Sequence, residues 1–212
     1  MSQVTINRNE KISCVSHFRE SVIIRRMKLP NPTWLGLLYA FSEMYLGLTH
    51  RARGVLSREK KSLRILWMII LGSVFFGVMS PAWFPTAVMP YRHTLRVIGF
   101  FIFVFALAFR WYSIGYLGKF FTVDVAIHSG HHVIETGPYR FIRHPSYTGA
   151  LLAFLGLGLC IGNLCSLAIF IIPTTIAFFL RINVEEQALA KALGEQYRSY
   201  QQRTKRLIPF IY

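Results

Sequence analysis

The sequence has little charge, and very little of it is negative. Among 212 residues only 16% are charged, and 9 Asp and Glu stand against 24 Lys and Arg, while 53% are hydrophobic. This composition argues against an ordinary soluble domain. The basic residues cluster between apolar runs, which indicates membrane topology rather than a nucleic-acid surface. We expect no cleavable signal peptide, because the first 27 residues are polar and basic without an apolar core.

Cysteine is scarce as well. Cys14, Cys160 and Cys165 form an odd set without C-x-x-C spacing, which argues against a zinc site and against a disulfide framework. Cys160 and Cys165 lie in apolar runs, so we interpret them as small hydrophobic residues. The seven histidines lack paired ligand spacing and neighbouring cysteines, and we therefore expect no metal.

The length of the chain predicts one domain. We expect residues 1–31 to form a basic, flexible extension and residues 32–212 to form a single membrane domain. Met27 is followed by Lys28 at the end of the polar stretch. Both Met1 and Met27 therefore stay open as the start of the native protein.

A membrane-spanning helix needs about 20 mostly apolar residues. Five stretches approach that length, so we predict an all-α integral membrane protein with about five transmembrane helices, at residues 33–48, 63–79, 95–113, 147–161 and 164–180. The first stretch is the weakest because Glu43 interrupts it. The second is expected to end at Ser80 and Pro81.

The last two apolar stretches are separated only by Gly162 and Asn163, a turn signal that predicts a tight helical hairpin. Because the hairpin folds the two helices back on each other, residues 143–147 and 181–186 are expected to meet at the membrane boundary. In the tail at 183–203, apolar residues recur at helical spacing among charged ones, which predicts an amphipathic helix on the membrane surface. Glu185 and Glu186 then open that helix, near its positive dipole end.

The loop charges predict an orientation. The loop at 50–64 is strongly basic, whereas the loop at 81–94 carries only Arg92 as a full positive charge. The positive-inside rule places the first loop, and with it residues 110–146 and the tail, in the cytoplasm. The basic N-terminus would then be external, a conflict that disappears if the first apolar segment does not span.

The residues expected to meet at the membrane boundary could bind a zwitterionic amino-acid ligand. Carboxylates of Glu185 and Glu186 can hold an ammonium group, and the forked guanidinium of Arg181 can hold a carboxylate. Tyr139 and Tyr147 offer aromatic faces for an adenine or a sulfonium. His144 stands before a proline that opens a helix, which fixes its direction.

Each of these residues also has an ordinary explanation. Arg143 and Arg181 could simply be basic residues that mark the cytoplasmic ends of helices, and the tyrosines could belong to the aromatic belt at the membrane interface. Glu185 and Glu186 suit helix capping. His131 and His132 suit a solvated loop. The expected convergence of the residues at one place favours a site.

The chain resembles the isoprenylcysteine carboxyl methyltransferases from about residue 119 to its C-terminus. The resemblance is carried by Gly137-Pro138-Tyr139, by the run from Arg143 through His144-Pro145-Ser146 to Tyr147, by Arg181 with Glu185-Glu186, and by Leu207-Ile208-Pro209-Phe210. Order, spacing and helix context all agree with the family. The N-terminal third carries no signature.

The resemblance implies a multi-helix membrane enzyme that uses S-adenosylmethionine without a Rossmann fingerprint. It places Arg181 at the position associated with the substrate carboxylate and makes Arg181 and Glu185 the catalytic pair. The implied cofactor contacts are His131, His132, Val133, Ile134, Tyr139, His144, Pro145, Ser146, Tyr147 and Glu185.

The expected function is therefore S-adenosylmethionine-dependent carboxyl O-methylation of a prenylated cysteine or a similar lipid-like acceptor. A phospholipid N-methyltransferase, a thiol methyltransferase and a non-enzymatic lipid-binding protein stay open as alternatives. We expect a multi-pass protein with a cytoplasmic site, in a prokaryotic plasma membrane or, in a eukaryote, the endoplasmic reticulum. We expect membrane lipid but no nucleic acid as a partner, and the oligomeric state stays open.

Overall fold

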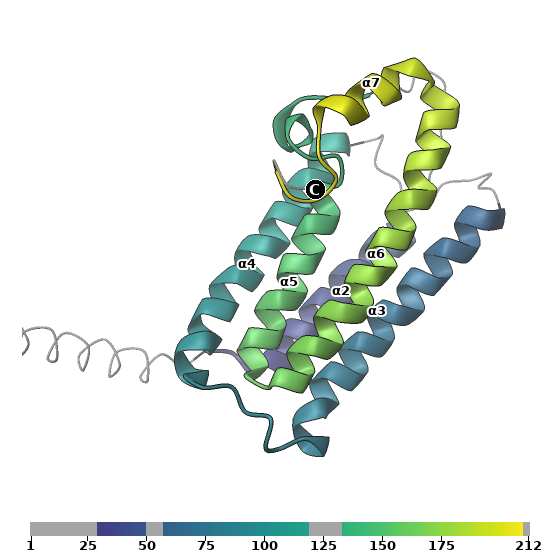
Figure 1. Ribbon diagram of the computed structural model, residues 1–212. Helices are drawn as coiled ribbons and strands as arrows, with labels where there is room; N and C mark the ends of the chain where they lie inside the picture. The colour runs from purple at the N-terminus through teal and green to yellow at the C-terminus, as the bar shows by residue number, and fades with distance from the viewer. Residues whose placement is uncertain (1–28, 50–56, 119–132, 210–212) are drawn as a thin grey trace, which may run out of the picture.

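A computed structural model describes residues 29–49, 57–118 and 133–209 (Figure 1). His131 and His132, Cys14, Phe210 and most of the predicted N-terminal extension lie outside these residues. The described part forms six α-helices and one short 3-10 helix, η2 at Gly137–Arg140. The α-helices are α2 (Pro32–Thr49), α3 (Ser57–Trp83), α4 (Arg92–Leu117), α5 (Pro145–Ile161), α6 (Leu164–Leu193) and α7 (Glu195–Arg203).

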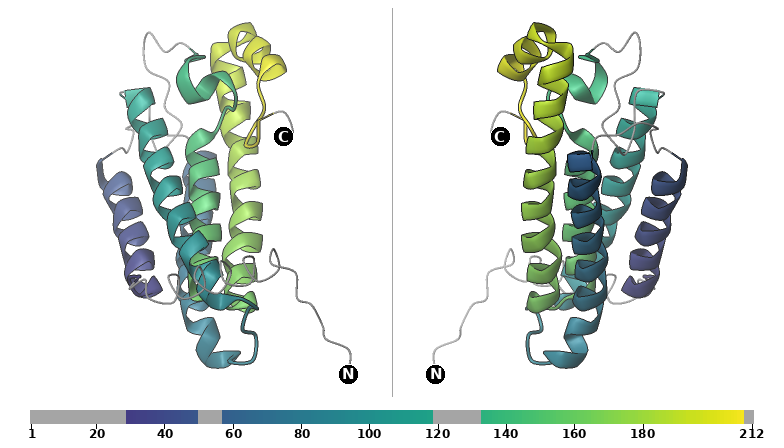
Figure 2. Two further views of the ribbon diagram at one scale, coloured as in Figure 1. Left: turned by 90° about the vertical axis from the view of Figure 1, so that its left-hand side faces the viewer. Right: turned by 90° about the vertical axis from the view of Figure 1, so that its right-hand side faces the viewer.

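Helices α2 to α6 run side by side as one bundle, while η2 and α7 lie together at one end of it (Figures 1 and 2). The main packing pairs are α4 with α5, α3 with α6 and α5 with α6. A core of buried apolar side chains joins them, including Phe103, Phe154 and Phe170. In the described part of the chain the all-α prediction is confirmed.

Three helices of the described part are long and apolar enough to cross a membrane: Lys61–Trp83 within α3, α4 and α6. The expected number of about five is therefore too high by these criteria, because α5 has only 17 residues and α2 is not apolar enough. Large apolar side chains such as Phe41, Phe105 and Ile172 face outward, as lipid contact requires. The chain is a multi-pass integral membrane protein.

The predicted hairpin between α5 and α6 is present. Gly162 ends α5 in the left-handed region, with φ 71° and ψ 32°, which suits a residue without a Cβ. Asn163 then caps α6, because its side-chain oxygen accepts a hydrogen bond from the Ser166 amide at 3.1 Å. The Asn163 side chain also donates to the Phe84 carbonyl at 2.9 Å. The turn is thus tied to the end of α3.

Two predicted helix ends are wrong. Helix α3 continues through Ser80 and Pro81 to Trp83, and a proline in the last turn removes only one backbone hydrogen bond. Helix α6 does not stop near Leu180 but continues to Leu193, where Gly194 follows with φ 59°. Glu185 and Glu186 therefore lie inside a continuous helix, and no helix N-terminus contributes a positive dipole there.

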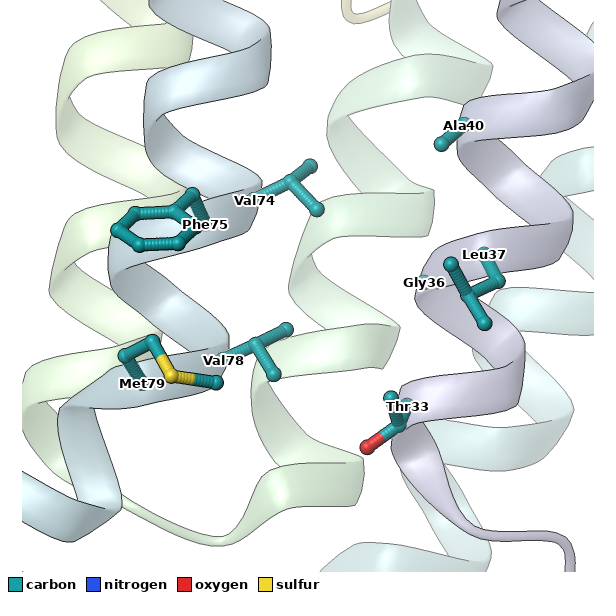
Figure 3. Close-up of a pocket in the computed structure, with 8 residues that line it drawn as sticks. All are labelled: Thr33, Gly36, Leu37, Ala40, Val74, Phe75, Val78 and Met79. Carbon is teal, nitrogen blue, oxygen red and sulfur yellow. The ribbon is translucent and has the colours of Figure 1, made fainter.

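An apolar groove separates α2 from α3 (Figure 3). Its lining comes from the first half of α2 and the second half of α3, which is the half of the bundle away from η2 and α7 (Figure 1). The lining residues are Thr33, Gly36, Leu37, Ala40, Val74, Phe75, Val78 and Met79. None of them is titratable, so the groove itself offers no acid–base chemistry.

Candidate functional site

The candidate site lies at the end of the bundle where η2 leads into α5. Tyr139 of η2 is buried there; its hydroxyl donates to the Ser113 carbonyl at 3.1 Å, and its own carbonyl accepts from the Tyr200 hydroxyl at 2.6 Å. Burial, reinforced by the nearby Glu185 carboxylate, raises the pKa of Tyr139 well above its ordinary value. Tyr139 is therefore a fixed, protonated hydrogen-bond donor that joins α4, η2 and α7.

The residues before α5 pair with residues 204–207, which we call the C-terminal segment. The Arg143 amide donates to the Lys205 carbonyl at 2.8 Å, and the His144 amide donates to the Arg206 carbonyl at 3.0 Å. The Thr148 hydroxyl, in the first turn of α5, donates to the Leu207 carbonyl at 2.7 Å. The C-terminal segment therefore holds the entry to α5 in place.

Glu186 is the centre of a buried ionic cluster. Its side chain is 4% exposed and lies 2.7 Å from Arg143 Nε, 2.8 Å from Arg206 Nη2 and 3.2 Å from His144 Nε2. These three partners come from the α5 entry and from the C-terminal segment. Glu186 is thus committed to holding three parts of the chain together, a role that its place in the sequence did not reveal.

Glu185, its neighbour on α6, has a different environment. It is half-buried, and its carboxylate accepts a hydrogen bond from the Tyr147 hydroxyl at 2.7 Å. The Tyr147 ring stacks on the imidazole of His144 with 5.5 Å between centroids and 10° between planes. Because a neutral phenol leaves the charge of Glu185 uncompensated by that contact, this carboxylate is suited to hold a cation.

Arg181 lies one helical turn before Glu185 on the same face of α6. Its residue exposure is only 1%, and its guanidinium is close enough to the Tyr147 phenol to interact with it. Arg181, Tyr147 and Glu185 therefore form one group. The convergence expected from the two-residue hairpin turn is present, and α5 and α6 supply it.

The remaining predicted residues in the described part of the chain lie just before η2 and at the start of α5. Pro145 and Ser146 are buried in the first turn of α5, and Val133 and Ile134 are half-buried before η2. The carbonyl of Ser146 accepts a hydrogen bond from Arg110 Nη1 at 2.7 Å. The sequence does not predict Arg110 as a site residue, and Glu43, its ion-pair partner, stands out only because it interrupts an apolar stretch. The sequence signal that could have revealed this pair is the presence of one acidic residue, Glu43, and one basic residue, Arg110, inside apolar stretches, where charges are usually paired.

Residues 97–191 match the model of the isoprenylcysteine carboxyl methyltransferase (ICMT) family. A protein-S-isoprenylcysteine O-methyltransferase of Schizosaccharomyces pombe is 33% identical over 81 residues, which are 38% of this chain and 34% of that protein. A methanethiol S-methyltransferase 1 of Bradyrhizobium diazoefficiens is 40% identical over 73 residues, which are 34% of this chain and 24% of that protein. The chain thus spans about a quarter to a third of these curated relatives.

A solved structure of the eukaryotic intramembrane Ras methyltransferase ICMT is similar in fold. The TM-score is 0.56 at 26% sequence identity, over 68% of this chain and 52% of that chain. The likeness therefore covers more of the chain than the family model matches.

Proposed function

The chain belongs, through residues 97–191, to the isoprenylcysteine carboxyl methyltransferase family, and on that premise we propose that it methylates an amphiphilic acceptor with S-adenosylmethionine as donor. The observation that carries the proposal is the group of Arg181, Tyr147 and Glu185 beside the stacked His144 ring. The reaction would take place at the end of the bundle that η2 and α7 cover.

The side chains around this group fit the proposed cofactor. The half-buried Glu185 carboxylate suits the α-ammonium of the methionine part, because it already accepts a hydrogen bond from Tyr147 and lies apart from the cations that surround Glu186. The aromatic faces of Tyr139 and Tyr147 suit an adenine or a sulfonium. Of the remaining proposed contacts, Val133 and Ile134 precede η2, His144 lies between η2 and α5, and Pro145 and Ser146 open α5, while His131 and His132 lie outside the described residues.

The proposed methyl transfer mainly requires the protein to hold the donor and the acceptor in the correct positions. S-adenosylmethionine, when bound, supplies an electrophilic methyl group on a sulfonium. An α-carboxylate has a pKa near ~3.5, so it is ionised at neutral pH and needs no general base. The residues of the site then have to align the acceptor and exclude water, which strengthens a carboxylate as a nucleophile.

Arg181 favours a carboxylate as the acceptor. Its guanidinium is close enough to the Tyr147 phenol of α5 to interact with it, and Arg181 lies one helical turn before Glu185 on α6. At 1% exposure, it would meet an acceptor inside the bundle rather than in bulk water. A carboxylate on a lipid-modified group, such as the C-terminal carboxylate of a prenylated cysteine, combines the charge and the apolar tail that this position requires.

A thiol acceptor is the second candidate. It is favoured by the methanethiol S-methyltransferase 1 of Bradyrhizobium diazoefficiens, which is 40% identical over 73 residues. A thiol has to lose its proton before attack, so its methylation would rise with pH through the neutral and alkaline range, whereas methylation of a carboxylate would not. A phospholipid amine is disfavoured by the positive charge of Arg181.

The direct test is an acceptor screen on the purified protein in detergent. Labelled S-adenosylmethionine would be incubated with N-acetyl-farnesylcysteine, with a long-chain thiol and with phosphatidylethanolamine. We expect methyl ester formation on N-acetyl-farnesylcysteine. Transfer only to the thiol would replace the carboxyl proposal by the second candidate, and absence of cofactor binding would leave a lipid-binding protein.

Variants of α6 test the residue roles. We expect Arg181→Ala and Glu185→Ala each to lower methyl transfer by at least about 100-fold, because misplacing a reactant by one ångström can have that effect. Asn183→Ala, an exposed position on the same helix, is the matched control and should keep wild-type activity. Membrane insertion is checked by fractionation. Full activity of either site variant contradicts the assignment.

A further inference from the structure

A second buried charge pair lies in the bundle, between α2 and α4. Arg110 Nε lies 2.6 Å from Glu43 Oε1 and Arg110 Nη2 lies 2.8 Å from Glu43 Oε2, a forked arrangement with both carboxylate oxygens used. The two side chains are 7% and 4% exposed. Glu43 lies in α2, which precedes the family-matched residues 97–191, whereas Arg110 lies within them.

The third donor of Arg110 reaches the candidate site. Its Nη1 donates to the carbonyl of Ser146 at 2.7 Å. Ser146 is the second residue of α5, between Pro145 and Tyr147, so this bond acts on the turn that carries His144 and Tyr147. The α2–α4 pair and the α5 entry are thus one connected set of hydrogen bonds.

The pair is more than an attachment of α2 to the bundle. Burying charged side chains within membrane helices costs free energy, and such residues are usually found where they serve a function. Attachment is already supplied next to the pair, where Trp111 Nε1 donates to the Ser42 hydroxyl at 2.9 Å and Tyr45 packs on Trp111 with centroids 5.9 Å apart. The Glu43–Arg110 pair continues by a hydrogen bond to the first turn of α5, whereas the aromatic contact of Tyr39 in α2 with Phe154 reaches α5 two turns further along.

We propose that Glu43 and Arg110 are positioning residues that fix the first turn of α5, and with it His144 and Tyr147, from outside the site. Glu43 holds the guanidinium in one plane through both of its oxygens. That plane aims Nη1 at the Ser146 carbonyl. The catalytic consequence rests on the proposed methyl-transfer function, whereas the mechanical coupling of α2 to α5 does not.

The coupling is tested without any ligand, by hydrogen–deuterium exchange of the purified protein in detergent. The reporters are the Tyr147 and Thr148 amides, which bond to the His144 carbonyl at 3.0 and 3.1 Å. In Glu43→Gln and Arg110→Lys we expect these amides to exchange at least about tenfold faster, the effect of losing one hydrogen bond to a charged group. Ser42→Ala, which removes only the neighbouring α2–α4 bond, should leave them unchanged.

A paired variant keeps the test decisive if a single substitution prevents folding. Glu43→Leu combined with Arg110→Met removes both charges and leaves no unpaired one in the bundle. We expect it to fold and still to show fast exchange at the first turn of α5. Wild-type exchange in this variant or in Arg110→Lys overturns the proposal.

Activity and cofactor affinity separate this inference from the proposed function. We expect Arg110→Lys to lower kcat and to weaken binding of S-adenosylhomocysteine about tenfold or more, while Ser42→Ala keeps both. If the wild-type protein transfers no methyl group, the proposed function fails and the exchange result still decides the coupling. If the wild type is active and the exchange is altered but kcat and affinity are not, the coupling has no role in positioning and the proposal is overturned.

Discussion

Adjacent glutamates on α6 have different surroundings. Glu186 is nearly enclosed and contacts two guanidinium groups and one imidazole, whereas Glu185 is half-buried and accepts a hydrogen bond from a phenol. A carboxylate with several cationic partners is structural, because removing it leaves their charges unpaired. Glu185 instead bonds to the neutral Tyr147 phenol, one helical turn after Arg181, and a ligand can still reach its half-buried carboxylate.

This difference predicts opposite effects of two substitutions. Glu186→Gln should lower the free energy of unfolding by about 3 kcal/mol, the usual cost of breaking a buried ion pair. Glu185→Gln should leave stability within about 0.5 kcal/mol, as for residues outside such networks, but weaken S-adenosylhomocysteine binding. Thermal unfolding in detergent and calorimetric titration measure the two effects. A large loss of stability in Glu185→Gln alone would contradict this division of roles.

The sequence identified Glu185 and Glu186 but could not tell them apart. Residues Arg143 and Glu186 are separated by 43 positions and Glu43 and Arg110 by 67, so their pairing depends on how distant helices pack. A pattern within one helix cannot show that. The contact of Tyr147 with Glu185 could be predicted because the hairpin turn, a local signal, brings the ends of α5 and α6 together.

At the scale of helices, the contact of α4 with α5 depends on glycine. A Cβ on Gly156 would lie 2.6 Å from the Phe103 amide nitrogen and 2.7 Å from the Gly99 carbonyl oxygen. Both are backbone atoms that cannot move aside. Close packing of this kind is common between membrane helices, where small residues let two backbones approach.

Gly156→Ala should therefore separate α4 from α5 and destabilise the protein by about 1–3 kcal/mol, the range for overpacked cores. Gly36→Ala is the matched control, because a Cβ there would meet side chains at 3.8 and 4.0 Å, which is ordinary contact. We expect the control to unfold at the wild-type temperature or above it, since alanine favours a helix. Equal unfolding temperatures for both variants would contradict the close-packing explanation.

Helix positions followed from apolar length, but helix ends did not. The apolar pattern fades after Leu180, while the helix itself continues to Leu193. The length of an apolar run reflects the environment of the side chains, whereas a helix ends where its backbone hydrogen bonds end. Pro81 does not end α3 at Ser80, because in the last turn of a helix a missing amide hydrogen bond has little effect.

For the whole molecule, the two ends of the bundle differ. One end carries the candidate site, η2, α7 and the C-terminal segment, and the other carries the α5–α6 turn and the connection from α3 to α4 (Figures 1 and 2). The positive-inside rule assigns the site end to the cytoplasm, where a soluble cofactor is made available. That orientation stays a prediction.

Single cysteines can test it in intact cells, after the natural cysteines are replaced by alanine. Lys205→Cys at the site end should react with a membrane-impermeant maleimide only after permeabilisation. Val88→Cys, beside the turn and 49% exposed, should react without it. The reverse pattern would place the site on the outer face.

The C-terminal segment has a consequence for biosynthesis. It follows every helix of the bundle in chain order, yet it lies against Arg143, His144 and Thr148 and supplies one of the cations on Glu186. Since chains fold from the N-terminus as they are synthesised, the helices can enter the bilayer while the site is still unfinished. The nascent protein thus acquires a membrane anchor first and an ordered α5 entry only after residues 204–207 have left the ribosome. A chain truncated before that point would insert without an ordered α5 entry.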